Sequence, residues 1–287
     1  EYQGTLYMSR SGQFISTYVI ATVTYSAGQA ITFTNITQGL IHSKDDVLYF
    51  GYDNNIASKN GAGAWNLTAL VLPTNMIITS LAEYGNLLAI GCRPQYAGGR
   101  SRVYIWDRNS SFATLQESTD FGEGSLYVLE NLNGYLVGIS QEGSQGLTNV
   151  ADRVVFRYST GGPGSHIFRE MIQSGTSNSP QLGKKRKVNN KLYFIMSVVL
   201  NSTTQEGVWA LDFLDPTNNF LTLNRTVNND TALITPTFHG FIPFGDFLFM
   251  SFVTNSVYTM TKTDDQATYT ASGTYESLII NGGDATM

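Results

Sequence analysis

A short apolar run that follows a tight turn recurs five times along the 287-residue chain. The turns are built from Asn, Asp and Gly, as in Asn133-Gly134. Such dipeptides provide the positive φ angles that two-residue β-hairpins require. The pattern therefore predicts five hairpins, each with an apolar second strand. These second strands are Val47–Phe50, Leu87–Ile90, Tyr135–Val137, Leu192–Ile195 and Phe247–Met250.

The spacing of these runs indicates a repeat of four strands. Each run is followed by a second predicted hairpin, so that every repeat is an antiparallel meander. A four-strand repeat of roughly 40 to 57 residues in an all-β chain is typical of the blades of a β-propeller. Runs that are apolar on both faces suit strands packed between neighbouring blades. The second hairpins are Asn55–Val71, Arg102–Ser118, Arg153–Ile172, Gly207–Val227 and Ser256–Gly273.

The two ends of the chain decide the number of blades. A sixth hairpin is predicted at Gly4–Ala21, and residues 276–287 resemble the start of another blade. Pairing the two ends would complete a sixth blade and remove open sheet edges. We therefore expect a single propeller over 1–287, with six blades; five or seven fit the same spacing. The rivals are a pair of β-sandwiches and a C-terminal stretch that begins another domain. Because the chain starts with Glu1, we expect it to be part of a longer protein.

Composition narrows the function classes. The net charge of −5 argues against a nucleic-acid partner, which would favour a basic surface. No apolar run is long enough to span a membrane as a helix. Cys92 is the single cysteine, so we expect a buried core residue rather than a nucleophile. The histidines His42, His166 and His239 are isolated in sequence, and no metal site or cofactor is predicted.

Two short motifs resemble known blades. Val103–Asp107 resembles the third-strand end of WD-repeat blades, although the Gly-His pair of that family is missing. Ser58–Trp65 resembles the Asp-box of sialidase-like propellers, with Asn60 in place of the Asp and Ala62 in place of the Gly. In that family the box is a structural turn between the third and fourth strands. The resemblance therefore implies a fold and no catalytic role.

The chain as a whole is similar to the propeller segments of tailed-phage virion proteins, particularly long tail-associated chains. The shared features are degenerate blades, low charge, Asn-, Thr-, Ser- and Gly-rich turns and few cysteines. Residues 275–284 resemble the passage from such a propeller into a following β domain. The resemblance implies a structural or host-attachment role, with a virion or extracellular location. The expected partners are other virion chains or a glycan or protein of the host surface.

Long loops suggest where a ligand would bind. In a meander, the loop after the second strand and the link to the next blade lie at one end of the blade. These connections are long at 92–101, 119–124, 141–152, 174–183 and 197–206, and long loops on a rigid scaffold commonly carry binding residues. The candidate binding residues are Arg93, Tyr96, Arg100, Gln141, Glu142, Gln145, Asp152, Gln205 and Glu206.

The sequence thus favours a non-catalytic structural and interaction propeller. The alternative is a secreted or surface propeller that binds or hydrolyses glycans, similar to sialidases. That site would need paired carboxylates and an arginine triad, and nothing in the sequence context of the arginines indicates one. The basic run Lys184–Lys187 is expected on the first strand of a blade, as a solvated edge or as a contact with an acidic partner. Six Asn-X-Ser/Thr sequons are interpreted as turn composition.

Overall fold

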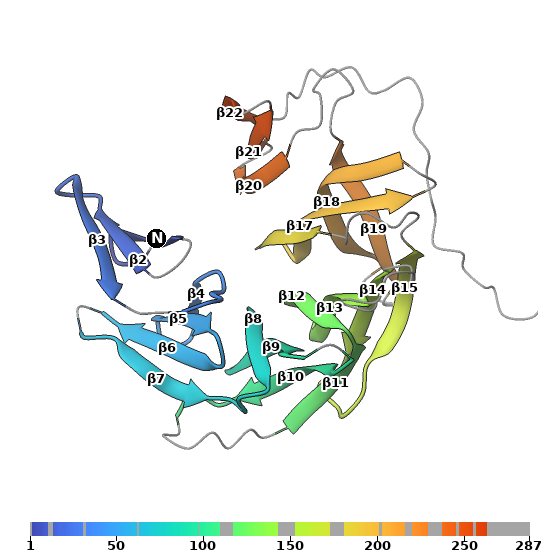
Figure 1. The fold of residues 1–287 in the computed structure, drawn as a ribbon, viewed down its shortest axis with the longest axis horizontal. Coiled ribbons are helices and arrows are strands. Elements are labelled where there is room, and N and C mark those ends of the chain that lie inside the picture. The colour runs from blue at the N-terminus through green and yellow to red at the C-terminus, as the bar shows by residue number, and fades with distance from the viewer. Residues whose placement is uncertain are drawn as a thin grey trace, which may run out of the picture. The chain divides into compact units, whose positions relative to one another are not determined.

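The strands form sheets that follow chain order (Figure 1). The computed structural model describes residues 2–10, 14–30, 33–61, 63–96, 98–109, 117–142, 153–172, 181–200, 203–215, 220–228, 237–244, 247–254 and 257–262. Every regular element in these segments is a β-strand. A search of the same segments finds no helix that could cross a membrane. The chain divides into two compact units, which we describe separately: residues 1–182 with 198–204, and residues 183–197 with 205–287.

The first unit holds four antiparallel sheets. The first has three strands, β1 (Thr5–Arg10), β2 (Phe14–Val19) and β3 (Thr24–Ala30). The second consists of β4 (Leu40–His42), β5 (Val47–Tyr52), β6 (Asn55–Asn60) and β7 (Asn66–Val71). The third consists of β8 (Met76–Tyr84), β9 (Leu87–Pro94), β10 (Arg100–Trp106) and β11 (Glu117–Glu123). The fourth consists of β12 (Ser125–Leu132), β13 (Tyr135–Glu142), β14 (Arg153–Ser159) and β15 (His166–Ile172).

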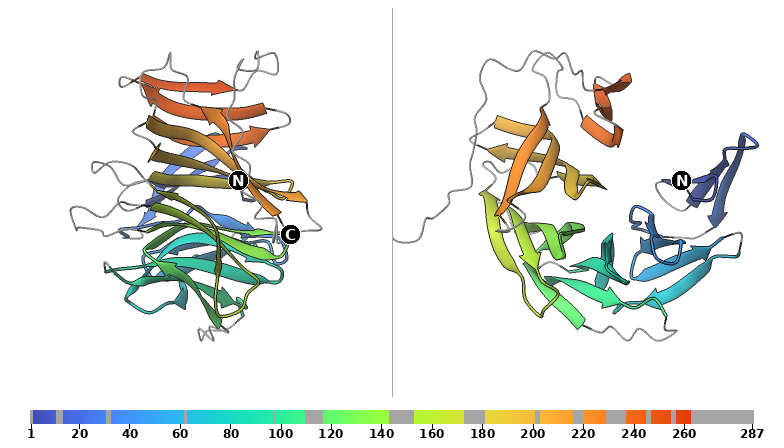
Figure 2. Two further views of the ribbon diagram at one scale, coloured as in Figure 1. Left: turned by 90° about the vertical axis from the view of Figure 1, so that its right-hand side faces the viewer. Right: turned by 180° about the vertical axis from the view of Figure 1, so that it is seen from behind.

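The second unit repeats this plan. One sheet consists of β16 (Gln181–Val188), β17 (Lys191–Leu200), β18 (Thr203–Asp215) and β19 (Phe220–Asn228). The other consists of β20 (Thr237–Phe244), β21 (Phe247–Thr254) and β22 (Val257–Lys262). The strands of this last sheet lie side by side in chain order in the views of Figure 2. Ile195, Val208, Phe241, Leu248 and Met250 form the buried apolar cluster of the unit.

The predicted second strand of each blade is confirmed in all five repeats. The five apolar runs are β5, β9, β13, β17 and β21, and each is the second strand of its sheet. Four of the preceding turns contain the expected positive φ angles, at Asp46 (50°), Gly85 (60°), Asn133 (50°) and Asn189 (47°). Local turn chemistry therefore places the second strand correctly in every repeat. The turn residues 245–246 lie outside the described segments.

Three predicted boundaries are wrong. The fourth strand of the third sheet is β11, at 117–123, so the predicted link 119–124 is reduced to Gly124. Thr119 and Phe121 are buried at alternate positions of this strand, but Thr119 is polar, so the sequence does not show an apolar period of two here. The predicted loop 197–206 is largely strand, because β17 and β18 extend through it. The predicted loop 92–101 is reduced to 95–99, because β9 ends at Pro94 and β10 begins at Arg100. The N-terminal hairpin is confirmed as β1 and β2 and is followed by β3, and its expected partner 276–287 lies outside the described residues.

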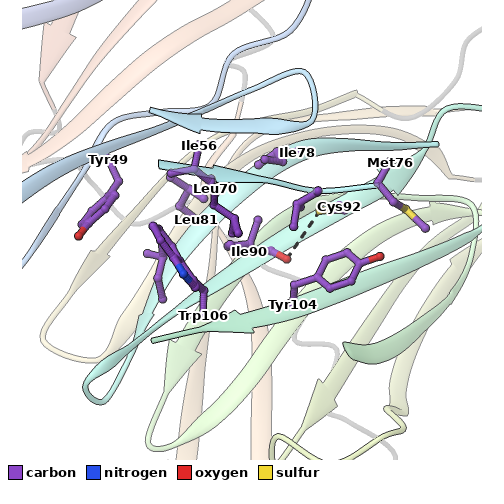
Figure 3. Packing of buried hydrophobic residues seen from close by; sticks show 12 residues of the cluster. Tyr49, Ile56, Leu70, Met76, Ile78, Leu81, Ile90, Cys92, Tyr104 and Trp106 are labelled. Atoms are coloured by element: carbon purple, nitrogen blue, oxygen red, sulfur yellow. Dashed lines mark hydrogen bonds between the residues drawn. The ribbon is translucent and has the colours of Figure 1, made fainter. Parts of the chain in front are cut away.

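The core of the first unit lies between neighbouring sheets. Tyr49, Ile56 and Leu70 pack from the second sheet against residues of the third that include Ile90 and Trp106 (Figure 3). The other face of the third sheet packs on the fourth through a second buried cluster. Because both faces of the third sheet are covered, its strands β9 and β10 contain continuous apolar runs, Leu87–Ile90 and Val103–Trp106. Burial of the apolar side chains is the main source of stability, at about 25 cal/mol per Å².

The Asp-box resemblance correctly predicts a turn. Residues 61–65 connect β6 to β7, the third and fourth strands of their sheet. The Gly63 amide donates a hydrogen bond to the Asn60 carbonyl (3.1 Å). The half-buried Trp65 ring contacts Tyr7 of β1 edge-on, with ring centroids 5.9 Å apart. The turn thus helps to join the first two sheets.

Gly124 alone connects β11 of the third sheet to β12 of the fourth, and its backbone is closely packed. It has φ of 89°, and a Cβ there would lie 2.2 Å from the Gln141 carbonyl oxygen. Gly134 has φ of 84° but open space around it. We expect both alanine variants to lose stability from the strained φ, about 1 kcal/mol each. Gly124→Ala should lose at least about 1 kcal/mol more in urea unfolding, because backbone atoms must move. Equal losses would contradict this close approach.

Candidate binding surface

The Tyr96 loop, residues 95–99, connects β9 to β10 and is held at both ends. The Gln95 amide donates to the Asn75 carbonyl (2.9 Å), which belongs to the link between β7 and β8. At the other end, the Gly124 amide donates to the Gly99 carbonyl (3.2 Å). The Gly99 amide also donates to the Tyr96 carbonyl (3.4 Å). Hydrogen bonds from two neighbouring links therefore hold Gln95 and Gly99 at the ends of the loop, while Tyr96 is 71% exposed.

Two arginines flank this loop, and their surroundings differ. Arg93, near the end of β9, is half-buried and forms no ion pair with any described residue. The Arg100 side chain, at the start of β10, is 52% exposed. Its Nε donates to Asp120 Oδ2 at 2.6 Å, and its Nη1 lies 4.0 Å from Glu123 Oε1. The hydrogen bond to Asp120 and the charge of that carboxylate raise the pKa of Arg100. The predicted proximity of 93, 96 and 100 thus follows from one hairpin.

Asp120 is the residue that sequence reasoning missed at this end of the blade. Its carboxylate accepts hydrogen bonds from Arg100 and from the Gly122 amide (2.7 Å). Its backbone accepts from the Ser165 hydroxyl of the next sheet (2.7 Å). Burial raises the pKa of Asp120, but the two hydrogen bonds and the charges of Arg100 and Arg102 outweigh it, so the net pKa is lowered. Asp120 therefore joins β11 to β10 through its carboxylate and to the next sheet through its backbone carbonyl.

The lowered pKa of Asp120 gives a pH dependence. A carboxyl group whose pKa is lower in the folded state stabilises the protein above its unfolded pKa of about 3.9. That stabilisation is lost as the pH falls through the folded pKa. We expect Asp120→Asn to be less stable than wild type near neutral pH and to approach it at about pH 3. Unfolding free energies measured across this range check the prediction, and parallel curves would contradict it.

Glu142 is a buried anchor rather than a surface residue. The side chain is 4% exposed at the end of β13. It accepts hydrogen bonds from Arg157 Nη2 (2.8 Å) and Arg153 Nη2 (3.0 Å) of β14. Arg153 Nη1 also lies 3.5 Å from Glu170 Oε2. Strand register could have suggested this, since Glu142 and Arg153 are ladder partners and Arg157 shares a face with Arg153. Gln141, its neighbour, is half-buried.

The arginines on these strands are matched by acids. Arg100, Arg102, Arg153 and Arg157 lie on β10 and β14, and their carboxylate neighbours are Asp120, Glu123, Glu142 and Glu170. Four guanidinium groups therefore face four carboxylates. Each ion pair lies within one sheet: Arg100 pairs with acids of β11, and Arg153 and Arg157 pair with Glu142 and Glu170 of the fourth sheet.

The remaining candidates lie elsewhere or outside the described structure. Gln205 and Glu206 are in β18 and not in a loop, and Glu206 is half-buried. Gln145 and Asp152 lie outside the described residues. Arg93, Tyr96 and Arg100 thus lie within or beside the single loop between β9 and β10, and Glu142 belongs to the ion-paired cluster.

Two reactive residue types have structural roles. Cys92 is fully buried among the apolar residues between the second and third sheets, and burial raises the pKa of its thiol. The expectation of a core cysteine is therefore confirmed. His42 is also fully buried; its Nδ1 accepts the Lys44 amide hydrogen (3.3 Å), and its Nε2 lies 3.1 Å from the Leu87 carbonyl oxygen. Across the described segments, no three His, Cys, Asp or Glu side chains are grouped so that they could hold a metal ion.

Comparison with known proteins bears on the fold of the chain and not on its family. No protein-family model and no curated protein sequence matches the chain. Among solved structures, a prolyl endopeptidase matches 91% of this chain with a TM-score of 0.51 and 8% sequence identity. The chain is a β-propeller. It spans 40% of that prolyl endopeptidase chain, and identity this low bears on the fold alone.

Two other solved structures are similar over the same share of the propeller. The N-terminal domain of Nup159 matches 91% of the chain and 71% of its own length, with a TM-score of 0.47 and 9% identity. A Bombyx mori GH32 β-fructofuranosidase mutant in complex with sucrose matches 91% of the chain and 57% of its own length. Its TM-score is 0.34 and its identity 13%. Neither match carries a functional inference.

Proposed function

We propose that this propeller is a non-catalytic structural and interaction module of a virion protein, of the tail-associated kind. It contacts a neighbouring virion chain or a ligand on the host surface through the Tyr96 loop. The observation that carries the proposal is the combination of an exposed tyrosine with a loop anchored at both ends. Tyrosine is enriched at binding hot spots, and a pre-ordered loop loses little conformational entropy on binding.

The charges around the loop support the same role. Arg93 has no acidic partner among the described residues, so a ligand carboxylate or carbonyl can satisfy its donors. Arg100 is largely exposed beside its acid partners and can contribute at the rim. A hydrolase of this kind would use carboxylates, and two carboxylates near this end of the blades are already hydrogen-bonded. Glu142 pairs with two arginines, and Asp120 pairs with Arg100. The virion assignment comes from the resemblance of the whole chain to phage propeller segments.

The experiment is a binding screen of the purified protein on a glycan array, on intact cells and against the other proteins of the virion, with cleavage of every bound glycan assayed in parallel. We expect retention on at least one surface, or on another virion protein, without any release of sugar. Hydrolysis of a bound glycan would overturn the non-catalytic part and favour the glycosidase alternative. Absence of binding to glycans, cells and virion proteins would contradict the interaction role itself.

A further inference from the structure

Strand β16 (Gln181–Val188) carries four consecutive cations, Lys184, Lys185, Arg186 and Lys187. It is the first strand of its sheet and is hydrogen-bonded to β17 alone among the described strands. Lys184 and Arg186 are exposed and form no ion pair with described residues. Since side chains alternate along a strand, these two lie on one face and Lys185 and Lys187 on the other. The strand edge is thus basic on both sides.

The blade architecture does not require these cations. The first strands β4, β8 and β12 of the other four-stranded sheets contain no Lys or Arg, and neither does β20. Those strands instead include the acids Glu83 and Glu130. Like charges two residues apart on one face repel each other, so the run opposes folding slightly. A single lysine would suffice to protect a strand edge from aggregation. A cluster of like charges that lowers the stability of the fold is characteristic of a binding function.

We infer that β16 binds an acidic polysaccharide through the sulfate or carboxylate groups of its sugars. The four residues extend over about 10 Å at roughly 3.3 Å per residue, which suits a short stretch of a chain that bears several anions. Lysine and arginine side chains carry hydrogen-bond donors and no acceptors, so they suit the anionic oxygens of such a ligand. Strand β16 contains no aromatic residue on which the bases of a single-stranded nucleic acid could stack, so a nucleic acid is the less suitable polyanion. The cations of β16 belong to the second unit and the Tyr96 loop to the first, and this inference does not depend on the function proposed for that loop.

The test uses heparin as the probe and titration calorimetry at about 0.15 M salt. We expect Lys184→Ala/Arg186→Ala to weaken heparin binding about tenfold and to reduce its salt dependence, because fewer counterions are released. The same variant should be at least as stable as wild type. The control Lys44→Ala/Lys262→Ala removes two exposed cations elsewhere and should change binding less than twofold. Unchanged heparin binding in the β16 variant would overturn the inference.

Hydrogen exchange of the wild-type protein provides a measurement that needs no variant. We expect heparin to slow amide exchange in residues 181–188, whereas protection elsewhere without protection of β16 would overturn the inference. A single-stranded DNA oligonucleotide serves as the competitor. We expect it to bind at least tenfold more weakly than heparin, and equal affinity would overturn the assignment to polysaccharide.

Discussion

Replacing Trp106 with alanine is expected to lower the free energy of unfolding by about 3–5 kcal/mol. Trp106 is 2% exposed, and its ring meets Tyr49 of the preceding sheet edge-on, with centroids 6.0 Å apart and an interplanar angle of 82°. The substitution therefore opens a cavity between two blades and removes an aromatic contact. Urea unfolding monitored by circular dichroism measures the effect. A loss below about 1 kcal/mol would mean that the two sheets do not pack together as described.

The variant Trp106→Phe distinguishes the contribution of the aromatic ring from that of the Nε1 donor. The Nε1 donor of Trp106 is buried without a hydrogen-bond partner in the described structure. An unsatisfied buried donor costs about 1–3 kcal/mol, so its removal offsets part of the volume lost. We expect Trp106→Phe to be destabilised by less than about 1.5 kcal/mol. A phenylalanine variant as unstable as the alanine variant would indicate that Nε1 has a partner.

Replacing Glu142 with glutamine is expected to cost about 3 kcal/mol of stability. The shape of the side chain is kept, but Arg157, whose side chain is 13% exposed, loses its charged partner in a buried setting. Removing one member of a buried ion pair is costly because the other charge stays desolvated. Arg153 is affected less, since it is more exposed and also lies near Glu170. Urea unfolding of the variant and of wild type measures this difference.

Two variants control the Glu142 experiment. Glu123→Gln removes a carboxylate that is 73% exposed and 4.0 Å from Arg100, and it should cost less than about 0.5 kcal/mol. Combining Glu142→Gln with Arg157→Met removes the unpaired charge and should restore part of the stability. If the double variant were as unstable as the sum of both single variants, the ion pair would not be the cause.

The blade pattern could be predicted because its determinants are local. Asn133 and Gly134 impose a hairpin wherever they occur, and the apolar run after them can only be buried. Strand β11 could not be located in this way, since Thr119 is buried by a hydrogen bond from its hydroxyl to the Gly162 carbonyl of the next sheet. Contacts between sheets decide that boundary, and the local sequence does not reveal them.

The candidate surface was predictable to the same extent. Arg93 and Arg100 flank the short loop that contains Tyr96. That these three residues belong to one hairpin could therefore be predicted from the local sequence. Glu142 has the same polar character in the sequence, but its burial depends on the register that places Arg153 opposite it. Whether a charged residue near a strand end faces solvent or a partner is therefore a tertiary property. The role of Asp120 could not be predicted for the same reason, because its hydrogen bonds to Arg100 and Ser165 depend on the tertiary structure.

The most direct test of the interaction role compares three loop substitutions with a matched control. The variant Arg93→Ala/Tyr96→Ala/Arg100→Ala removes the side chains of the candidate surface, and Val23→Ala/Lys44→Ala alters exposed side chains away from it. Affinity for the glycan, cell or virion protein identified in the binding screen is then measured for both. We predict at least a hundredfold loss in the loop variant, with folding intact, and less than a twofold change in the control. Full binding by the folded loop variant would contradict the assignment of the Tyr96 loop as the binding surface.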